Sequence, residues 1–279
     1  MPGPDLPALP EPLPYPVVDN HCHLDLGRGP SVLPVDEALR LAGSVGVKRI
    51  VQIGCDLPGA RWAVETAGEY DAVVAGVSLH PNEAPRLAAE GDLDAAVAEI
   101  DRLAGSSPRV RAVGETGLDY FRTGPEGVEA QQESFRAHIA LAKQHGKTLV
   151  IHDRDAHDDV LKVVDSEGAP DRVVMHCFSG DADFARACVE RGFWLSYAGT
   201  VTFRNAEPLR AALAVTPPDR VLVETDAPFL TPMPHRGRTN ASYLVPLTVR
   251  AMAVTLGADL ADLCRTIDAN TDAAFGGPW

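Results

Sequence analysis

Short runs rich in β-branched residues alternate with stretches of helical period along almost the whole chain, and this alternation is the strongest constraint on its fold. The runs predict eight strands, near Val17–His21, Arg49–Gly54, Ala72–Ser78, Val110–Gly114, Thr148–Ile151, Val173–Met175, Phe193–Tyr197 and Val221–Glu224. Eight strands that alternate with helices over about 250 residues are typical of a (β/α)8 TIM barrel, an α/β fold. A doubly wound parallel sheet stays open, because periodicity does not report whether a sheet closes.

Two of the intervening stretches show helical period clearly. Within residues 128–145, Phe135 and Ile139 fall on one helical face, and the stretch Leu93–Leu103 carries a similar apolar stripe. Glycines follow these stretches, as expected where helices end. The polar segment Thr231–Asn240 contains proline and glycine, so it predicts a long loop after the eighth strand.

The start of the chain differs from the rest. Seven of the first sixteen residues are proline, which predicts an extended arm over residues 1–16, followed by a single barrel domain over 17–279. The arm lacks the basic and apolar regions of a secretory signal, and no apolar run approaches the roughly 18–20 residues of a membrane span. Five scattered cysteines fit a reducing compartment. These features predict a cytoplasmic protein with no membrane partner.

Acidic residues outnumber basic ones, 39 Asp and Glu against 25 Lys and Arg, so the formal charge is −14. Such a balance argues against broad, charge-driven binding to nucleic acid or to an anionic membrane. Any attraction for phosphate would have to be local, through bound cations and a few arginines.

The first predicted strand ends in a His-x-His pair. His21 and His23 share one face of the strand because side chains alternate along it, whereas Cys22 points the other way. Two imidazoles on one face can supply nitrogen ligands to a metal ion. Exposed or structural histidines would produce the same pattern, so the other strand ends decide what the pair means.

Further residues with metal-binding side chains stand at the ends of later predicted strands: Glu115, His152, His176 and Asp226. The carboxyl ends of the strands meet on one face of a barrel, which is where active sites are assembled. The combined set offers imidazole and carboxylate donors and no thiolate. It suits zinc, manganese, magnesium or ferrous iron, and it is large enough for two ions if one carboxylate bridges them.

Several motifs occur in an order that resembles the TatD family of metal-dependent deoxyribonucleases, which belongs to the amidohydrolase-like barrels. They are VDNHCHLD, GETGLDYFR, the Gln132–Phe135 region, IHDRDA, HCFSG and ETDAPFL, and the resemblance spans about Val17 to Phe275. It implies a hydrolase that uses a metal-activated water to cleave phosphodiester bonds of DNA, as an exonuclease on single-stranded or 3′ ends. It also implies two divalent ions (Mg²⁺, Mn²⁺ or Zn²⁺) and no obligate protein partner.

The resemblance assigns ligands to both ions by motif position. One ion would be held by His21, His23, Glu115 and Asp226. The other would be held by Glu115, His152 and His176, with Glu115 as the bridge.

Catalytic and substrate-binding roles are predicted for residues in the same motifs. Asp226 would act as general base for the attacking water, and Glu115 would share in catalysis through the ions. A phosphate oxygen would be bound by Arg154. Further substrate contacts are predicted for His80, Phe178 and Tyr120, although His80 could instead bind a metal ion. The rings of Tyr120, Phe121 and Phe178 are available to stack on bases, with buried packing at the barrel rim as the alternative.

The sequence departs from the family pattern in two places. Thr239–Ser242 stands where the family often carries Asn-Glu-Pro, so an acidic residue near the loop or substrate is missing. The proline-rich arm also lies outside the family pattern.

Three other functions compete with DNA hydrolysis. An amide hydrolase of the same barrel class would often bridge its metals with a carboxylated lysine, and Glu115 at that strand favours a phosphodiesterase instead. Cleavage of aminoacyl-tRNA esters stays open, because the same metal-bound hydroxide would attack a carbonyl. A non-catalytic, metal-binding barrel predicts loss of a ligand, and all six are present.

Overall fold

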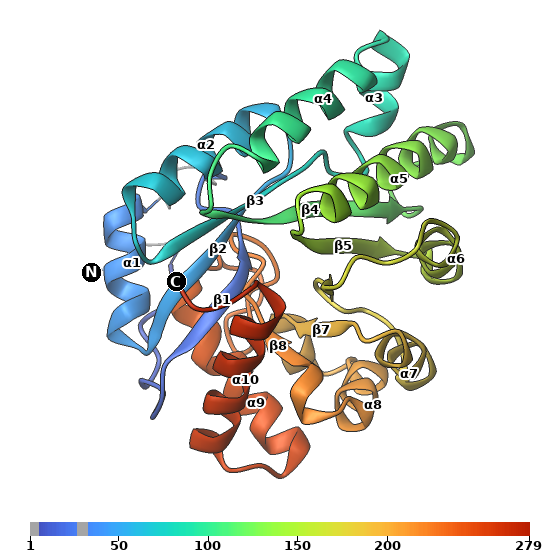
Figure 1. Ribbon diagram of the computed structural model, residues 1–279. Helices are drawn as coiled ribbons and strands as arrows, with labels where there is room; N and C mark the ends of the chain where they lie inside the picture. The colour runs from blue at the N-terminus through green and yellow to red at the C-terminus, as the bar shows by residue number, and fades with distance from the viewer. Residues whose placement is uncertain (1–5, 27–32) are drawn as a thin grey trace. The chain divides into compact units, whose positions relative to one another are not determined.

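The computed structural model describes residues 6–26 and 33–279 (Figure 1). Internal contacts group the chain into two compact units. The first unit comprises the described residues of 1–52 together with 180–273 and Trp279. The second unit comprises residues 53–179 and 274–278.

The first unit contains three whole strands and most of a fourth: β1 (Val17–Cys22), β2 (Val47–Gly54), β7 (Trp194–Tyr197) and β8 (Val221–Val223). Strand β1 pairs with β2 and β7 pairs with β8, both in parallel. A parallel bridge between Cys22 and Ala227 joins β1 to the segment after β8. The helices are α1 (Val35–Ser44), α7 (Ala182–Glu190), α8 (Glu207–Val215), α9 (Val245–Leu256) and α10 (Leu260–Ala274), with 3-10 turns η3 (Gly199–Thr202), η4 (Pro218–Arg220) and η5 (Ser242–Leu244).

The second unit contains the parallel strands β3 (Val73–Val77), β4 (Val110–Asp119), β5 (Thr148–Arg154) and β6 (Val173–Met175). They are hydrogen-bonded in chain order. Helix α2 (Leu57–Glu69) precedes β3, and the helices between the strands are α3 (Ala84–Glu90), α4 (Leu93–Ala104), α5 (Val128–Gln144) and α6 (His157–Glu167), with the 3-10 turn η2 (Pro125–Gly127). Figure 1 shows these elements from cyan through green to yellow.

Burial explains why the strands read as continuous apolar runs. Every residue of β3 and of β6 is buried, as in parallel strands that are covered on both faces. In α5, Phe135 and Ile139 of the predicted stripe are buried. Helix α2 begins after Asp56, whose carboxylate accepts a hydrogen bond from the amide of Gly59 at 2.7 Å and so satisfies an otherwise unpaired donor.

The predicted alternation of eight strands with helices is confirmed, as are the helices predicted over 93–103 and 128–145. Strands β4 and β5 end later than predicted, because their pairing continues as far as Asp119 and Arg154. The prediction that Glu115 and His152 end their strands is therefore wrong, since both lie inside them. Cross-strand hydrogen bonding lengthens the strands, and local periodicity does not report it.

The described part of the predicted arm, residues 6–16, contains no helix or strand. Leu6 and Leu13 are buried, and the hydroxyl of Tyr243 donates to the carbonyl of Pro7 at 2.7 Å. The arm therefore packs against the first unit, and the assignment of 17–279 as a single domain stays a prediction. Among the described residues no single helix is long and apolar enough to cross a membrane. One pair, Ser242–Leu256 with Leu260–Ala274, reaches that length and composition only when joined across a 111° bend.

Candidate metal centre

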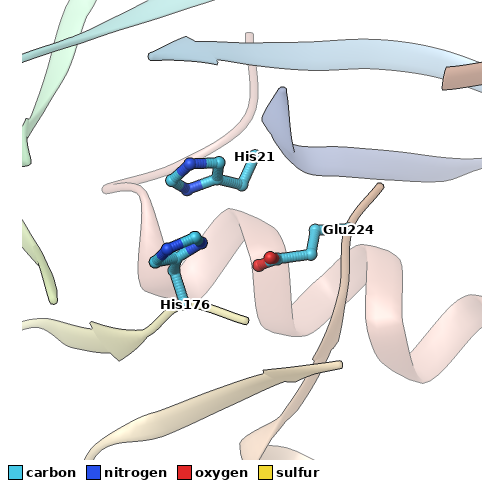
Figure 2. A group of neighbouring side chains, drawn as sticks. All are labelled: His21, His176 and Glu224. Atoms are coloured by element: carbon cyan, nitrogen blue, oxygen red, sulfur yellow. The ribbon is translucent and has the colours of Figure 1, made fainter. Parts of the chain in front are cut away.

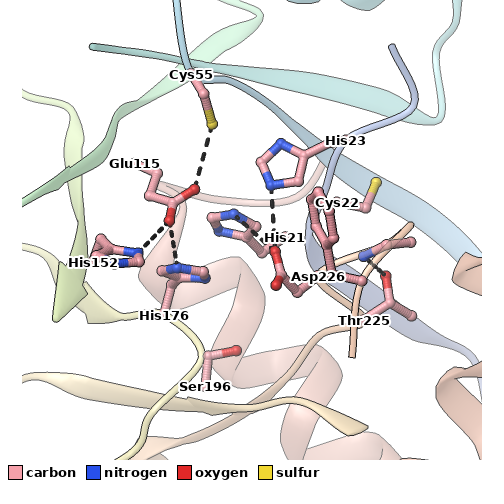
Figure 3. Close-up of polar contacts among 12 residues, drawn as sticks. His21, Cys22, His23, Cys55, Glu115, His152, His176, Ser196, Thr225 and Asp226 are labelled. Atoms are coloured by element: carbon pink, nitrogen blue, oxygen red, sulfur yellow. Dashed lines mark hydrogen bonds and ion pairs between the residues drawn. The ribbon is translucent and has the colours of Figure 1, made fainter. Parts of the chain in front are cut away.

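A first-unit cluster consists of His21, His23 and Asp226 (Figure 3). Nε2 of His23 lies 3.3 Å from Oδ1 of Asp226, and Nε2 of His21 lies 3.9 Å from the same oxygen. The two imidazole rings meet edge to face, with centroids 5.0 Å apart. The structure thus brings together three of the four residues predicted to hold one ion.

Backbone hydrogen bonds hold this cluster in place. Asp226 lies three residues beyond the end of β8, in a turn where its φ of 55° is left-handed. Its amide donates to the carbonyl of His21 at 2.9 Å, and the amide of His23 donates to the carbonyl of Ala227 at 2.8 Å. The main chain on both sides of Asp226 is therefore tied to β1 and its end.

Cys22 confirms the predicted alternation along β1. It is buried and packs with Ile50 and Ala227, away from the imidazoles on either side of it in the sequence. Burial raises the pKa of its thiol well above the ordinary value. Cys22 is therefore part of the packing and is poorly suited to act as a nucleophile.

Glu224 is a buried acid that sequence reasoning did not single out. A carboxylate oxygen of Glu224 and a ring nitrogen of His21, both possible metal ligands, lie within 4.8 Å of each other (Figure 2). Side-chain alternation contained the signal, because Glu224 and Asp226 are two residues apart. A second acid therefore lies close to the first-unit cluster.

A second-unit cluster gathers three histidines around Glu115. The distances to Oε1 of Glu115 are 2.6 Å from Nδ1 of His152, 2.8 Å from Nε2 of His176 and 3.4 Å from Nε2 of His80. The other oxygen, Oε2, accepts a contact from the thiol of Cys55 at 3.4 Å. Figure 3 shows Cys55, His152 and His176 converging on this carboxylate. His80, predicted to contact substrate, thus lies with the candidate ligands.

The charge state of Glu115 follows from these neighbours. Burial by itself would raise the pKa of this carboxyl, but His176, His80 and His152 hold it well below its ordinary value. Burial would lower the pKa of His152, yet hydrogen bonds to Asp119 and Glu115 raise it. The cluster therefore keeps an ionised carboxylate in a buried position.

The position of Glu115 depends on an irregularity in β4. The register with β5 shifts between Gly114 and Thr116, so Glu115 lies at a bulge. Gly114 has φ 146°, and a Cβ there would lie 2.4 Å from the carbonyl oxygen of Val150. Only glycine fits that close approach between strands.

Asp119, at the end of β4, is a further acid that sequence reasoning missed. Its Oδ1 accepts the amides of Phe121 and Arg122 at 3.1 and 2.9 Å, and its Oδ2 accepts Asn82 Nδ2 at 3.2 Å. Nε2 of His152 lies 3.4 Å from Oδ2. Burial would raise the pKa of Asp119, but these partners hold it well below its usual range. The acid therefore faces the side of the His152 ring opposite Glu115.

The donor sets fit divalent ions. Two ligands that each lie about 2.1 Å from one ion are about 3.0–3.4 Å apart at neighbouring corners of an octahedron or tetrahedron. The contacts from His23 to Asp226 and from His80 to Glu115, at 3.3 and 3.4 Å, match that spacing and are long for hydrogen bonds. Imidazole nitrogen with carboxylate oxygen suits Zn²⁺, Mn²⁺ or Mg²⁺.

The predicted substrate residues have different surroundings. The guanidinium of Arg154 lies 3.8 Å above the ring of Phe121, which is 63% exposed. Tyr120 donates its hydroxyl to Asp159 at 3.0 Å. Phe178 is only 2% exposed, so the exposed ring for stacking is Phe121, and the stacking role of Phe178 stays a prediction.

The loop predicted over Thr231–Asn240 is confirmed, since it contains no helix or strand. At its end, the side-chain amide of Asn240 donates to the carbonyls of Thr225 and Phe229 at 2.9 and 2.6 Å. Asn240 lies in the segment that departs from the family pattern. Here a neutral amide supports the turn around Asp226.

Comparison with known proteins gives consistent results. The family model for TatD-related DNases matches residues 18–276. An uncharacterized metal-dependent hydrolase TatD from Mycobacterium tuberculosis is 45% identical over 270 residues, which cover 94% of this chain and 99% of that protein. The uncharacterized metal-dependent hydrolase YcfH from Escherichia coli K12 is 40% identical, with 93% and 95% covered.

Solved structures show the same fold. YJJV, a TatD homologue from Escherichia coli K12, matches with a TM-score of 0.86 at 25% identity and covers 94% of this chain and 98% of its own. A TatD-family hydrolase from Entamoeba histolytica matches with a TM-score of 0.81 at 19% identity, covering 94% and 99%. The predicted (β/α)8 TIM-barrel fold class is confirmed.

Proposed function

Because the chain belongs to the TatD family of metal-dependent hydrolases, we propose that it is a deoxyribonuclease that hydrolyses phosphodiester bonds with the help of two divalent ions. The observation that carries the proposal is that each unit holds its own cluster of imidazole and carboxylate donors. In each cluster one contact between a histidine and the carboxylate, His23 to Asp226 and His80 to Glu115, has the spacing of two ligands on one ion. The family membership supports DNA as the substrate class.

The candidate ligands follow from the two clusters. We assign one ion to His21, His23 and Asp226 and the other to Glu115, His152 and His176, with His80 as a further donor beside Glu115. The bridging role of Glu115 rests on the family resemblance and stays a prediction. The identity of the metal within the set Mg²⁺, Mn²⁺ and Zn²⁺ is open to direct measurement.

Different residues of the chain would take different roles in hydrolysis. Bound divalent ions lower the pKa of water and offset charge on a phosphate. Asp226, 15% exposed, would accept the proton of the attacking water. Arg154 would donate to a phosphate oxygen, and the exposed face of Phe121 would stack on a base. Tyr120 would complete the contacts to the substrate.

The net charge of −14 shapes how DNA would be bound. A strongly acidic protein repels a polyanion at long range, so local cations must supply the attraction. We therefore expect weak, metal-dependent binding of single-stranded or 3′ ends without a basic groove. Tight binding of DNA in EDTA would contradict this expectation. We also propose a cytoplasmic location, which imaging of the fluorescently tagged protein in cells would test.

The proposal is tested by incubating the purified protein with end-labelled single-stranded DNA in Mg²⁺, Mn²⁺, Zn²⁺ or EDTA. Metal-dependent release of nucleotides from one end is expected, with no release in EDTA. Parallel incubations with RNA, a cyclic amide and an aminoacyl-tRNA test the competing activities. Metal-dependent turnover of one of these without DNA cleavage would replace the deoxyribonuclease proposal, and metal binding without any turnover would favour the binding barrel.

A further inference from the structure

Asp19 is a buried carboxylate on β1 that metal binding and hydrolysis leave without a role. It is fully buried and lies two residues before His21. Its Oδ1 accepts the amide of Thr225 at 2.8 Å, and its Oδ2 accepts the hydroxyl of Thr225 at 2.6 Å. Both oxygens therefore accept hydrogen bonds from Thr225, the residue before Asp226.

The hydroxyl of Thr225 links Asp19 to the next part of the turn through a second hydrogen bond. While it donates to Asp19, it accepts a hydrogen bond from the amide of Ala227 at 3.1 Å. The carbonyl of Ala227 in turn accepts the amide of His23 at 2.8 Å. The residues on both sides of Asp226 are thus fixed by one chain of hydrogen bonds that starts at Asp19.

Such support matters because Asp226 adopts a conformation that a non-glycine residue disfavours. Its φ of 55° lies in the left-handed region, which is unfavourable for a residue with a Cβ and persists only when the surroundings impose it. The hydrogen bonds at Thr225 and Ala227 impose it from both sides. Without them, the turn would relax and carry the carboxylate away from His23.

The geometry points to Asp19 and Thr225 as positioning residues that hold the Asp226 carboxylate in the first-unit cluster. The direction of these hydrogen bonds follows from the single proton of the Thr225 hydroxyl. Because the hydroxyl donates that proton to Asp19, its oxygen is left to accept the amide of Ala227. An asparagine at position 19 would present a donor to that hydroxyl and so reverse or break this series of hydrogen bonds. This inference rests on the proposed metal site and adds two residues to it.

The test measures Mn²⁺ binding by titration, with thermal melting and DNA cleavage in parallel. In Asp19→Asn and Thr225→Val, one class of Mn²⁺ site should weaken about 10–100-fold, as for other residues that orient metal ligands, while the other class changes by less than about twofold. Thr225→Ser keeps the hydroxyl and should bind Mn²⁺ nearly as the unaltered protein does. Thr216→Val is the matched control, because Thr216 is another buried first-unit threonine, and its hydroxyl bonds to Ala212 and Tyr197.

The outcomes separate this inference from the proposed function. If the unaltered protein binds no Mn²⁺, the proposed metal site fails and the positioning role fails with it. If it binds Mn²⁺ and both Thr225→Val and Thr216→Val merely lower the melting temperature without changing Mn²⁺ affinity, only the positioning role is overturned. Should Asp19→Asn fail to fold, the comparison of Thr225→Val with Thr225→Ser decides.

Discussion

The two metal-binding clusters are built in different ways. In the first unit, Asp226 sits in a turn beyond β8, in a left-handed conformation that hydrogen bonds to neighbouring backbone must impose. In the second unit, Glu115 sits inside β4, where pairing with β5 holds it on either side of a bulge. A ligand in a turn depends on a few specific hydrogen bonds, whereas a ligand in a paired strand shares the stability of the sheet.

The clusters also differ in charge balance. Asp226 faces two histidines and remains 15% exposed, whereas Glu115 faces three histidines and is 5% exposed. Removing charge from Glu115 should therefore disturb its surroundings more than the same change at Asp226, because buried charged groups have no water to replace a lost partner.

The largest effect is expected from Glu115→Gln. The amide cannot supply the negative charge that His152 and His176 face, so we expect at least about a 10³-fold loss of DNA cleavage. Mn²⁺ titration should show one class of site lost. Glu129→Gln, an exposed change in the same unit, is the control and should leave cleavage unchanged. Retention of both Mn²⁺ sites in Glu115→Gln would remove Glu115 from the ligands.

Asp226→Asn should lower cleavage by about 10²–10³-fold, since asparagine cannot accept the proton of the attacking water. The fold should survive, because the backbone hydrogen bonds of the turn do not involve this side chain. Circular dichroism and thermal melting check the fold, and single-turnover cleavage checks the chemistry. Full activity in this variant would exclude Asp226 as the general base.

The second unit should also carry an acid sensitivity through His138. Burial lowers the pKa of His138 to about 4, and its Nε2 accepts the amide of Leu79, next to His80. The unfolded chain binds a proton below about pH 6.5 while the folded protein stays neutral to about pH 4, so stability falls as pH drops through this window. The loss amounts to about 2 kcal/mol between pH 7.5 and pH 5.

Urea unfolding at several pH values measures this term. His138→Gln keeps an acceptor for the Leu79 amide and has no proton to gain, so its free energy of unfolding should fall less between pH 7.5 and pH 5. Parallel pH profiles for the two proteins would show that other groups are responsible.

The smallest effect is expected at the aromatic surface. Arg154 stacks on Phe121 in the second unit, and Arg236 stacks on Phe203 in the first at 4.3 Å, which gives two comparable pairs. We expect Phe121→Ala to raise KM for single-stranded DNA about 5–10-fold through lost base stacking. Phe203→Ala should change KM less. An equal rise in both variants would show that Phe121 has no special place in substrate binding.

Much of the fold was readable from local pattern. Strand runs and helical stripes, such as Phe135 and Ile139 in α5, depend on which face of an element is buried, and that leaves a period in the sequence. The ends of β4 and β5 were not readable, because they are decided by hydrogen bonds to a partner strand far away along the chain.

The candidate site divides in the same way. The types and order of His21, His23, Glu115, His152, His176 and Asp226 are properties of the sequence, and they were enough to suggest metal binding. His80 and Asp119 were harder to place, because local spacing does not tell which neighbours a polar residue meets. Alternation put Glu224 on the same side as Asp226, but it did not tell that the side chain of Glu224 would meet His21.

The sequence by itself determined the fold class, the family and the chemistry of the donor atoms, because these depend on residue type and local spacing. Only the tertiary structure decided that Asp19 accepts hydrogen bonds from Thr225, which lies 206 positions later in the sequence. It also decided that three histidines converge on Glu115. Hydrogen bonds and ion pairs act over about 3 Å in space whatever the separation in sequence. For the same reason, the acidic composition does not predict which carboxylates lie beside histidines.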